Sequence, residues 1–447
     1  MKLHISASRA FIVFITIHLI AFNVALGQKP LDSTISRYSI GITSQPPGTE
    51  VSLRLNWRFQ NYNSKPQHIN DNYDKSIQSP KSVNFSKDGK KFYVESLEGY
   101  TTSVYDTETM TLLKVIIHDF KKSDSLLFVN GETSVFGYKY RDNHKNYNVF
   151  KGKPVESCMS HDGKYLWVTY YRREFDMNAE CPSAVAIIDT ETDSIVRVMP
   201  SGPLPKMIAC SPDNKYIAVT HWGDNTCGII DISSDSVENF KYIEHLIVDY
   251  KAKLDFGDQA VNRDQQCGHC LRGTVFSTDG KYLLIGKMGG AGGIAIFSVP
   301  DFEYLGTLTG QKSNLRHLII SGDYLIISTN TSGYVQKALL QEIIEAKLSV
   351  PNKTATYTGW QSCYVGKGVR TIDVTSDGKY IFAAVNNECK ISVIRSEDMQ
   401  IICTIKADAY PVGMALSPDD TKLIVTSQGK SEKGGNSVMV FDILLHK

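Results

Sequence analysis

The sequence has no excess of charge of either sign, which limits the partners that its surface as a whole can attract. It contains 48 lysine and arginine residues and 47 aspartate and glutamate residues, for a formal net charge of +1. A balanced chain has no long-range attraction for nucleic acid or for acidic surfaces. We therefore expect no nucleic-acid partner, and any argument from charge has to rest on local clusters.

Motifs of several common enzyme classes are also missing. The chain has no glycine-rich nucleotide loop, no zinc-protease helix motif and no nucleophile elbow. No spacing of histidine and cysteine residues indicates a four-ligand zinc site. These absences predict that the protein holds no cofactor and no metal, and they leave open whether it is an enzyme.

Long hydrophobic runs are confined to the N-terminus. Residues 1–27 have the pattern of a secretory signal peptide, with Lys2 and Arg9 before the apolar stretch and small residues at Ala25-Leu-Gly27 for cleavage. An uncleaved membrane anchor is the alternative, because the stretch is close to spanning length. Residue 28 is Gln and not Cys, so a lipoprotein acylation site is absent. We expect an exported protein, periplasmic, secreted or on the cell surface, with no membrane insertion after signal cleavage.

The nine cysteines leave at least one without an intramolecular partner, because nine is odd. Cys158 and Cys210 fall in predicted inner strands, where a buried free thiol is expected. The tight pair Cys267-Gly-His-Cys270 enters a strand, whereas thiol catalysis needs a helix N-terminus. Haem attachment needs His after the second Cys, where Leu271 stands. The pair is a local disulfide or two loop thiols.

What the chain does contain is a repeated hairpin signature. Eight times a short apolar run precedes a polar turn and a second apolar run, and seven of these turns contain Asp-Gly, Pro-Asp or a variant. The clearest copies are 83–94, 208–219, 275–285, 372–382 and 414–425. A period of about 40 to 50 residues with four strands is typical of a β-propeller. The sequence predicts an all-β propeller of seven or eight four-stranded blades over residues 79–447.

Most units continue with a third strand that ends in an aspartate turn, as in 102–109, 184–192 and 437–442. These repeats resemble the YVTN-type β-propeller family of exported bacterial and archaeal surface or periplasmic proteins. The resemblance covers roughly residues 79–447 and implies the fold, with seven blades the usual number. Of the eight signatures, the second (118–152) is compressed, and it is either a blade or part of a neighbour. The fold implies no particular function, since one ring hosts binders, scaffolds and enzymes.

Residues 28–78 precede the repeats and are polar and irregular, with strand-like pieces at 38–43 and 50–59. This N-terminal extension either lends a strand that closes the ring or forms a small separate module. The longest insertion, 233–266, separates the fourth and fifth units, and long connections in compact rings are often functional.

A column of basic residues is the main candidate for a binding site. Five residues before each turn serine, five of the eight units carry a cation. The occupants are Lys81, Ile117, Val155, Lys206, Arg272, Arg316, Arg370 and Val412. First strands line the channel of a propeller, so these cations are expected to form a ring at its mouth and to bind an anion. Arginine favours planar, bidentate recognition. The alternative is internal pairing with loop carboxylates such as Glu156 or Asp264.

Loops that are expected on the same face add aromatic and amide groups. Arg172 follows Tyr170 and Tyr171 in the third unit, and His221 precedes Trp222 in the fourth. Rings beside guanidinium and amide groups suit a sugar or another polar ring. The alternative is that these rings pack as core between the blades. Adjacent strand residues face opposite sides, so at most one of the two tyrosines faces a ligand.

These observations favour a propeller that binds an anionic small molecule or acidic glycan, such as a cell-wall fragment or carboxylated metabolite, at its basic mouth. Lys81, Lys206, Arg272, Arg316 and Arg370 are expected to hold the anion, and Arg172, His221 and Trp222 the rest of the ligand. The first alternative is a polysaccharide lyase or a lactonase-like hydrolase at the same site, with His221, His317 or a tyrosine as proton carrier. The second is a scaffold that binds a protein partner.

Overall fold

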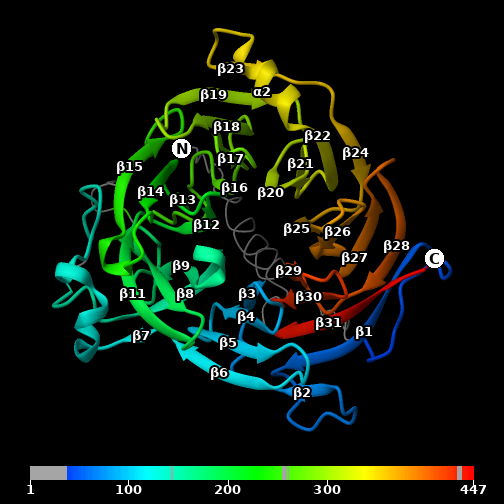
Figure 1. The fold of residues 1–447 in the computed structure, drawn as a ribbon. Helices are drawn as coiled ribbons and strands as arrows, with labels where there is room; N and C mark the ends of the chain where they lie inside the picture. Colours follow the sequence, from blue (N-terminus) through cyan, green and yellow to red (C-terminus); the bar gives the residue numbers. More distant parts are fainter. Residues whose placement is uncertain (1–37, 142–143, 254–258, 260, 430–434, 447) are drawn as a thin grey trace, which may run out of the picture. The chain divides into compact units, whose positions relative to one another are not determined.

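The computed structural model describes residues 38–141, 144–253, 259, 261–429 and 435–446. Within these residues seven β-sheets stand around a common centre, each with its first strand innermost (Figure 1). The predicted all-β propeller is confirmed, and it has seven blades. The predicted signal peptide lies outside the described residues. No helix within them is long and apolar enough to cross a membrane.

Each blade is an antiparallel sheet of four strands, numbered here from the inside outward. Blade one contains β3 (Pro80–Phe85), β4 (Lys91–Ser96), β5 (Thr101–Asp106) and β6 (Leu112–Ile117). Blade two contains β8 (Phe150–Ser160), β9 (Tyr165–Arg173), β10 (Ser183–Asp189) and β11 (Ser194–Ser201). Blade three contains β12 (Pro205–Cys210), β13 (Tyr216–His221), β14 (Thr226–Asp231) and β15 (Lys241–Ile247). Blade four contains β16 (Leu271–Phe276), β17 (Tyr282–Lys287), β18 (Gly293–Ser298) and β19 (Tyr304–Thr309).

The remaining blades follow the same plan. Blade five contains β20 (Leu315–Ser321), β21 (Tyr324–Thr329), β22 (Tyr334–Leu339) and β24 (Gln361–Tyr364). Blade six contains β25 (Val369–Val374), β26 (Tyr380–Val385), β27 (Lys390–Arg395) and β28 (Gln400–Lys406). Blade seven contains β29 (Pro411–Leu416), β30 (Lys422–Ser427), β31 (Ser437–Leu445) and β1 (Val51–Gln60). Short strands β2 (Asp71–Tyr73), β7 (Asp119–Phe120) and β23 (Thr354–Thr356) extend three of the sheets.

Blade seven is built from both ends of the described chain. Strand β1 pairs antiparallel with β31 from Val51↔Leu445 to Gln60↔Ser437 (Figure 1). Alternate residues of β1, including Leu53 and Leu55, are fully buried in the core of this blade. An N-terminal strand that matches the predicted 50–59 segment therefore closes the ring, as the outer strand of the blade whose other three strands come from the C-terminal end.

The compressed second signature does not form a blade, so of the seven or eight blades predicted the ring has seven. Within residues 118–152 the structure has β7, which pairs with the start of β8, and the 3₁₀ turns η1 (Lys122–Leu127) and η2 (Val129–Gly131). The degenerate turn position at Lys122 begins η1 and not a hairpin. The apolar residues that follow Lys122, from Leu126 to Val129, lie in and between these 3₁₀ turns and not in a second strand.

One side-chain hydrogen bond recurs in the hairpin turns and explains the repeated signature. The turn hydroxyl donates to Oδ1 of the aspartate two residues later, over 2.6–2.7 Å. The pairs are Ser86–Asp88, Ser211–Asp213, Ser277–Asp279, Thr375–Asp377 and Ser417–Asp419. Such local bonds satisfy turn backbone without help from the rest of the fold.

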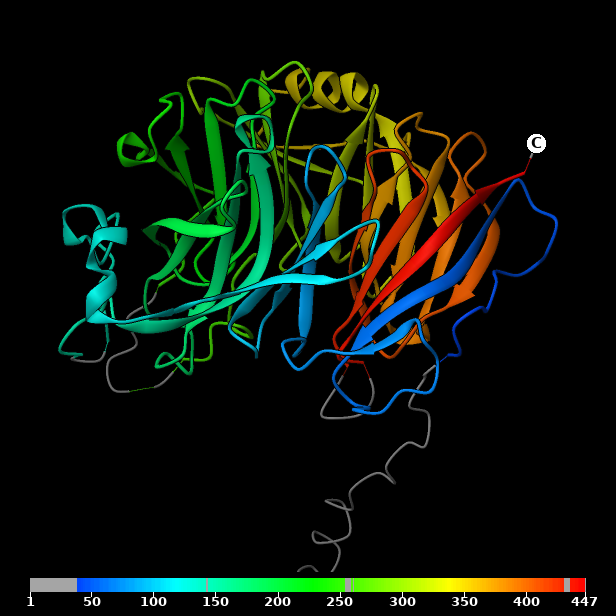
Figure 2. The same cartoon turned by 60° about the horizontal axis from the view of Figure 1, so that its bottom comes forward.

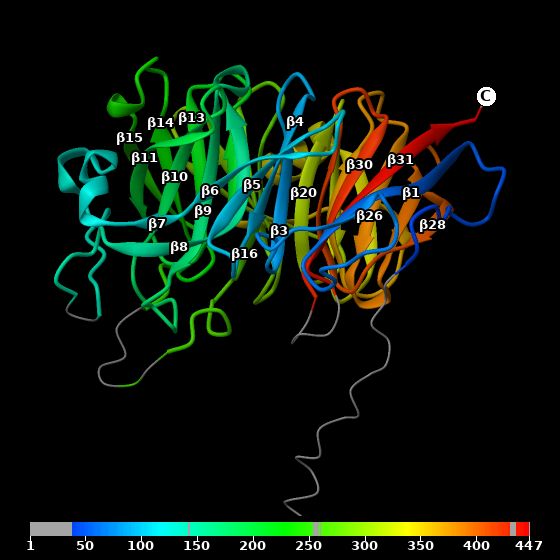
Figure 3. The same cartoon turned by 90° about the horizontal axis from the view of Figure 1, so that it is seen from below.

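The ring has two different faces (Figures 2 and 3). The hairpins that join first to second strands lie on one face, and the inner strands begin on the other. Strand β31 runs from the second face to the first, where the C-terminus is marked (Figure 3). The helix α2 (Leu340–Leu348) lies at the periphery against β19 and β23 (Figure 1).

Candidate functional site

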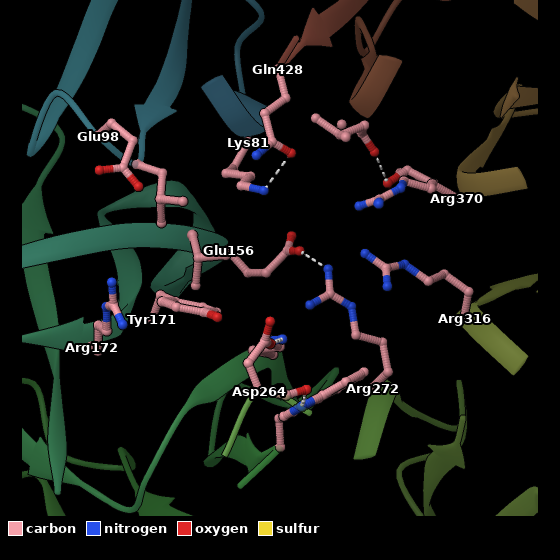
Figure 4. A pocket seen from close by; sticks show the side chains of 17 residues that line it. Lys81, Glu98, Glu156, Tyr171, Arg172, Asp264, Arg272, Arg316, Arg370 and Gln428 are labelled. Atoms are coloured by element: carbon pink, nitrogen blue, oxygen red, sulfur yellow. Dashed lines mark hydrogen bonds and ion pairs between the residues drawn. The ribbon is translucent and has the colours of Figure 1, made fainter. Parts of the chain in front are cut away.

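A cavity of about 430 Å³ opens where the inner strands begin (Figure 4). Seven of the eight predicted site residues line it, namely Lys81, Arg172, Lys206, Trp222, Arg272, Arg316 and Arg370. Tyr171, Glu98, Glu156, Asp264 and Gln428 lie among them. The structure thus gathers side chains from all seven blades and from the long insertion into one site.

The basic column converges because its members occupy equivalent positions. Lys81, Lys206, Arg272, Arg316 and Arg370 are each the second residue of an inner strand. In each of these strands the pairing register shifts at this point. An irregularity of this kind locally disrupts the ladder and re-aims side chains, here toward the axis of the ring.

Two of the five cations form ion pairs inside the cavity. Arg272 Nη2 lies 2.5 Å from Glu156 Oε1, and Lys206 forms an ion pair with Asp264. Lys81 Nζ donates a hydrogen bond to the amide oxygen of Gln428 at 2.6 Å. Internal pairing with Glu156 and Asp264, the alternative to anion binding, therefore accounts for part of the column and not for all of it.

Arg316 and Arg370 have no such partner. Among the residues that the structure describes, no carboxylate lies within ion-pair distance of either guanidinium, and Arg316 Nη1 donates a hydrogen bond to Met288 Sδ at 3.7 Å. Within the same residues the buried Nε of Arg370 has no hydrogen-bond partner. Burial and the neighbouring Arg272 lower the pKa of Arg370 to about 10. Arg370 is therefore still protonated at neutral pH, and it faces the cavity with its charge uncompensated.

Aromatic rings form the wall beside Lys206. Its Nζ lies 3.8 Å from the ring centroid of Trp222 and 5.0 Å from that of Tyr171. The indole N–H of Trp222 donates to the backbone oxygen of Asp264 at 3.1 Å. Burial lowers the pKa of Lys206 to about 7, against the opposing effect of Asp264. The guanidinium of Arg172 lies beside this wall, 5.8 Å from the Tyr171 centroid, and donates to the backbone oxygen of Met177.

The structure places His221 outside the cavity, which corrects its assignment as a ligand contact. It is completely buried, accepts a hydrogen bond from the Gly202 N–H at Nε2, and pairs through Nδ1 with Thr226. The sequence position beside Trp222 is misleading, because adjacent residues at a strand end point to opposite sides. Of the two tyrosines, Tyr170 is buried against His118, and Tyr171 lines the cavity.

His317, a candidate proton carrier, lies deeper in the channel. It lines a second cavity of about 210 Å³, which shares Glu156, Thr371 and Gly413 with the first. Burial lowers the pKa of His317 to about 3, so its imidazole is neutral. Tyr171, which lines the first cavity, has its phenol pKa raised by burial and by Asp264. Neither group is tuned to remove a proton at neutral pH.

Cys267 and Cys270 form a disulfide in the loop that leads to Arg272. Cys267 is buried in a small apolar cluster with Leu204 and Trp222. Of the two alternatives, a local disulfide or two loop thiols, the structure has the disulfide, and it constrains the segment between two cavity residues, Asp264 and Arg272. Cys158 and Cys210 are not disulfide-bonded.

Some cavity residues had no clear signal in the sequence. Glu98 and Thr371 line the cavity although neither stands in the basic column. Glu98 belongs to the loop between the second and third strands of blade one, a position that other blades fill with aromatic or amide residues. Among the described residues no group of histidine, cysteine, aspartate and glutamate side chains is arranged to hold a metal ion.

The cavity wall carries six cationic and three carboxylate side chains, an excess of three positive charges when all are ionised. A cavity with this excess is suited to holding an anion, since fixed charges in a partly desolvated site act more strongly than in water.

Comparison with known proteins supports the fold and little else. No family model matches the chain, so the resemblance to the YVTN-type family stays a prediction. Antigen Lp49 of Leptospira interrogans serogroup Icterohaemorrhagiae serovar copenhageni (strain Fiocruz L1-130) is 24% identical over 169 residues. That match spans 33% of this chain and 37% of the antigen, well under half of either protein.

Several solved structures share the architecture at low sequence identity. Hydrazine synthase of Kuenenia stuttgartiensis is 14% identical with a TM-score of 0.56, over 86% of this chain and all of that chain. The propeller domain of Cps50 (Swd1) from Myceliophteria thermophila is 13% identical with a TM-score of 0.54, over 82% of this chain and 96% of that domain's chain. A chain of the mitotic checkpoint complex is 12% identical with a TM-score of 0.53, over 82% of this chain and 90% of that chain. At identities this low, the similarity shows the fold alone.

Proposed function

We propose that this protein is an exported β-propeller that binds a small anionic ligand in the basic cavity of its channel. The observation that carries the proposal is the pair Arg316 and Arg370, two neighbouring guanidinium groups that face the cavity without a carboxylate partner among the described residues. Like charges that are held together in a partly desolvated site repel each other. A bound anion offsets this repulsion and supplies the missing hydrogen-bond acceptors.

Export rests on the N-terminal sequence, since residues 1–27 combine a positive start, an apolar stretch and a small-residue cleavage site. The Cys267–Cys270 disulfide supports it, because disulfides persist in oxidising compartments. Binding is favoured over lyase or hydrolase chemistry because His221 and His317 do not line the cavity, and because burial raises the pKa of Tyr171, the candidate proton carrier that does line it. No observation favours a protein partner over a small ligand.

The test is isothermal titration calorimetry of the purified protein with inorganic sulfate, inorganic phosphate, citrate and glucuronate, at low and at high sodium chloride. We expect at least one of these anions to bind, with an affinity that falls as salt rises. The double variant Arg316→Ala/Arg370→Ala is expected to lose this binding. The control variant Arg54→Ala/Lys90→Ala removes the same number of charges from exposed positions and is expected to bind normally. Failure of all four anions to bind the wild-type protein would overturn the proposal.

A further inference from the structure

Ion-paired charges and charges without a carboxylate partner come from different blades around the cavity. Blades two, three and four contribute Glu156, Lys206 and Arg272, and with Asp264 from the insertion these charges form ion pairs. We call these four residues the paired half. Blades five, six and one contribute Arg316, Arg370 and Lys81, which we call the unpaired half. No member of the unpaired half has a carboxylate partner among the described residues.

The unpaired half is continuous along the wall. Blade seven, which lies between blades six and one, places the uncharged Val412 at the equivalent position, so no negative charge interrupts the arc. Figure 4 shows the side chains of Arg316, Arg370 and Lys81 pointing toward the same space. Burial lowers the pKa of Lys81 well below its ordinary value, and Arg370 is the charge that lowers it most. An anion at this position relieves the repulsion among all three.

The opposite wall has a different chemistry. Tyr171 lies across the cavity from Arg316 and Arg370 (Figure 4), and it presents a half-buried ring. Glu156 and Asp264 stand beside it, and a carboxylate that accepts one ion pair keeps further lone pairs for hydroxyl donors. An aromatic face with acceptors at its edge is what a hydroxylated ring needs, because such a ring has apolar faces and a polar rim.

We infer that the ligand is an acidic sugar, with its carboxylate or phosphate held by the unpaired half and its hydroxylated ring placed between Tyr171 and the carboxylates of the paired half. This inference rests on the proposed anion binding and adds the orientation and the second chemical element of the ligand. A cavity of about 430 Å³ falls in the range of ligand pockets, roughly 300–1,000 Å³, so a small saccharide is accommodated.

A series of probes built on one ring tests the inference by calorimetry. The probes are glucuronate, glucose 1-phosphate, glucose, inorganic phosphate and acetate. We expect a sugar acid to bind about tenfold more tightly than the matching ringless anion, a difference of about 1.4 kcal/mol, and glucose not to bind measurably. Comparison of glucuronate with acetate, and of glucose 1-phosphate with phosphate, measures the contribution of the ring. Comparison of acetate with phosphate shows which anionic group the unpaired half prefers.

Two variants test the contact with the ring and the contact with the anionic group separately. Tyr171→Leu keeps an apolar group at the wall, and it is expected to lower the affinity for the sugar acid several-fold while leaving the affinity for the ringless anion within about twofold. Tyr364→Leu is the matched control, because that tyrosine is exposed on β24, away from the cavity. Arg316→Ala/Arg370→Ala is expected to abolish binding of both kinds of anion.

The outcomes separate the inference from the proposed function. If inorganic phosphate and acetate bind as tightly as the sugar acids and depend on Arg316 and Arg370, anion binding stands and the acidic-sugar inference is overturned. If Tyr171→Leu lowers the affinity for ringless anions as much as that for sugar acids, the placement of the ring is wrong. If glucose binds as tightly as glucuronate, the unpaired half does not hold the ligand. If no probe binds, both proposals fail.

Discussion

Glu156 of β8 and Arg272 of β16 form a 2.5 Å ion pair that joins blade two to blade four across the channel. Their side chains are 20% and 10% exposed, so the pair is largely withdrawn from water. Blade three lies between the two strands, and the pair therefore connects blades that are not neighbours in the ring. The same contact removes one arginine from the charge that is available to an anion.

Glu156→Gln is expected to destabilise the protein, because it leaves the buried Arg272 without a compensating charge. Breaking a buried pair by removing one partner costs about 3 kcal/mol, which urea unfolding would measure. Asp162→Asn, which removes an exposed ion pair with Lys87, is the control and should change little. Added sulfate should restore more stability to Glu156→Gln than to the wild-type protein, and no difference between them would contradict the role of Glu156 as the internal counter-charge.

Arg316→Met is expected to raise the stability of the ligand-free protein by about 1 kcal/mol. The substitution removes a buried cation that is repelled by Arg272 and Arg370, and it supplies an apolar side chain of similar length beside Met288. Thermal unfolding without added anion measures the change. A lower melting temperature would mean that Arg316 is held by contacts that stabilise the fold.

Anion affinity is expected to fall as pH rises above neutrality. Burial lowers the pKa of Lys206 to about 7, and a bound anion favours its protonated form. Affinity is therefore full below pH 7, where Lys206 is already charged in the empty cavity, and it decreases at higher pH. Titration with sulfate between pH 6 and 9 measures this, because sulfate keeps its charge over that range. Lys206→Met should bind more weakly at pH 6 and flatten the profile, and a profile as steep as that of the wild type would assign the titration to another group.

Cys267→Ser/Cys270→Ser is expected to lower the free energy of unfolding by about 2 kcal/mol, the entropy of closing so short a loop. Anion affinity should fall as well, because the loop carries Asp264 and leads into Arg272. Unfolding and binding are measured on the variant and on the wild-type protein with dithiothreitol. Dithiothreitol should lower the stability and the anion affinity of the wild-type protein and leave those of the variant unchanged. An equal effect on both proteins would mean that the reductant acts at another site.

Leu53→Ala is expected to lower the free energy of unfolding by about 3 kcal/mol, because Leu53 is fully buried in blade seven, where β1 pairs with β31. The neighbouring Arg54→Ala is a matched control, because Arg54 lies on the exposed face of the same strand. Chemical denaturation distinguishes them. Equal and small effects would indicate that β1 contributes little to closure of the ring.

Much of the fold was predictable because its repeated signal is local. A turn hydroxyl and an aspartate two residues apart make their hydrogen bond within one hairpin, as Ser86 and Asp88 do. The number of blades was harder, since the compressed segment 118–152 carries part of a repeat signature and folds as 3₁₀ turns with a short strand. Whether such a segment becomes a blade depends on the space between its neighbours, which a single unit does not encode.

The basic residues of the candidate site were also predictable from the sequence, whereas some of its other members were not. Equivalent positions in a repeat converge on one height of the channel, so a column of basic residues is visible in the chain before it is folded. The exclusion of His221 was not visible, because its burial is set by Gly202 and Thr226, which surround it only in the folded blade. Glu98 likewise enters the cavity through a loop whose path depends on the adjacent blade.

The sequence by itself determined the hairpins, the strand order within each blade and the positions from which cations face the channel, since these follow from contacts within a few residues. Only the tertiary structure decided which cations keep their charge free. Arg272 meets a carboxylate 116 residues away, Lys206 meets one 58 residues away, and Arg316 and Arg370 meet none among the described residues. These contacts between residues far apart in the sequence depend on closure of the ring, which brings together blades that share no local sequence relationship.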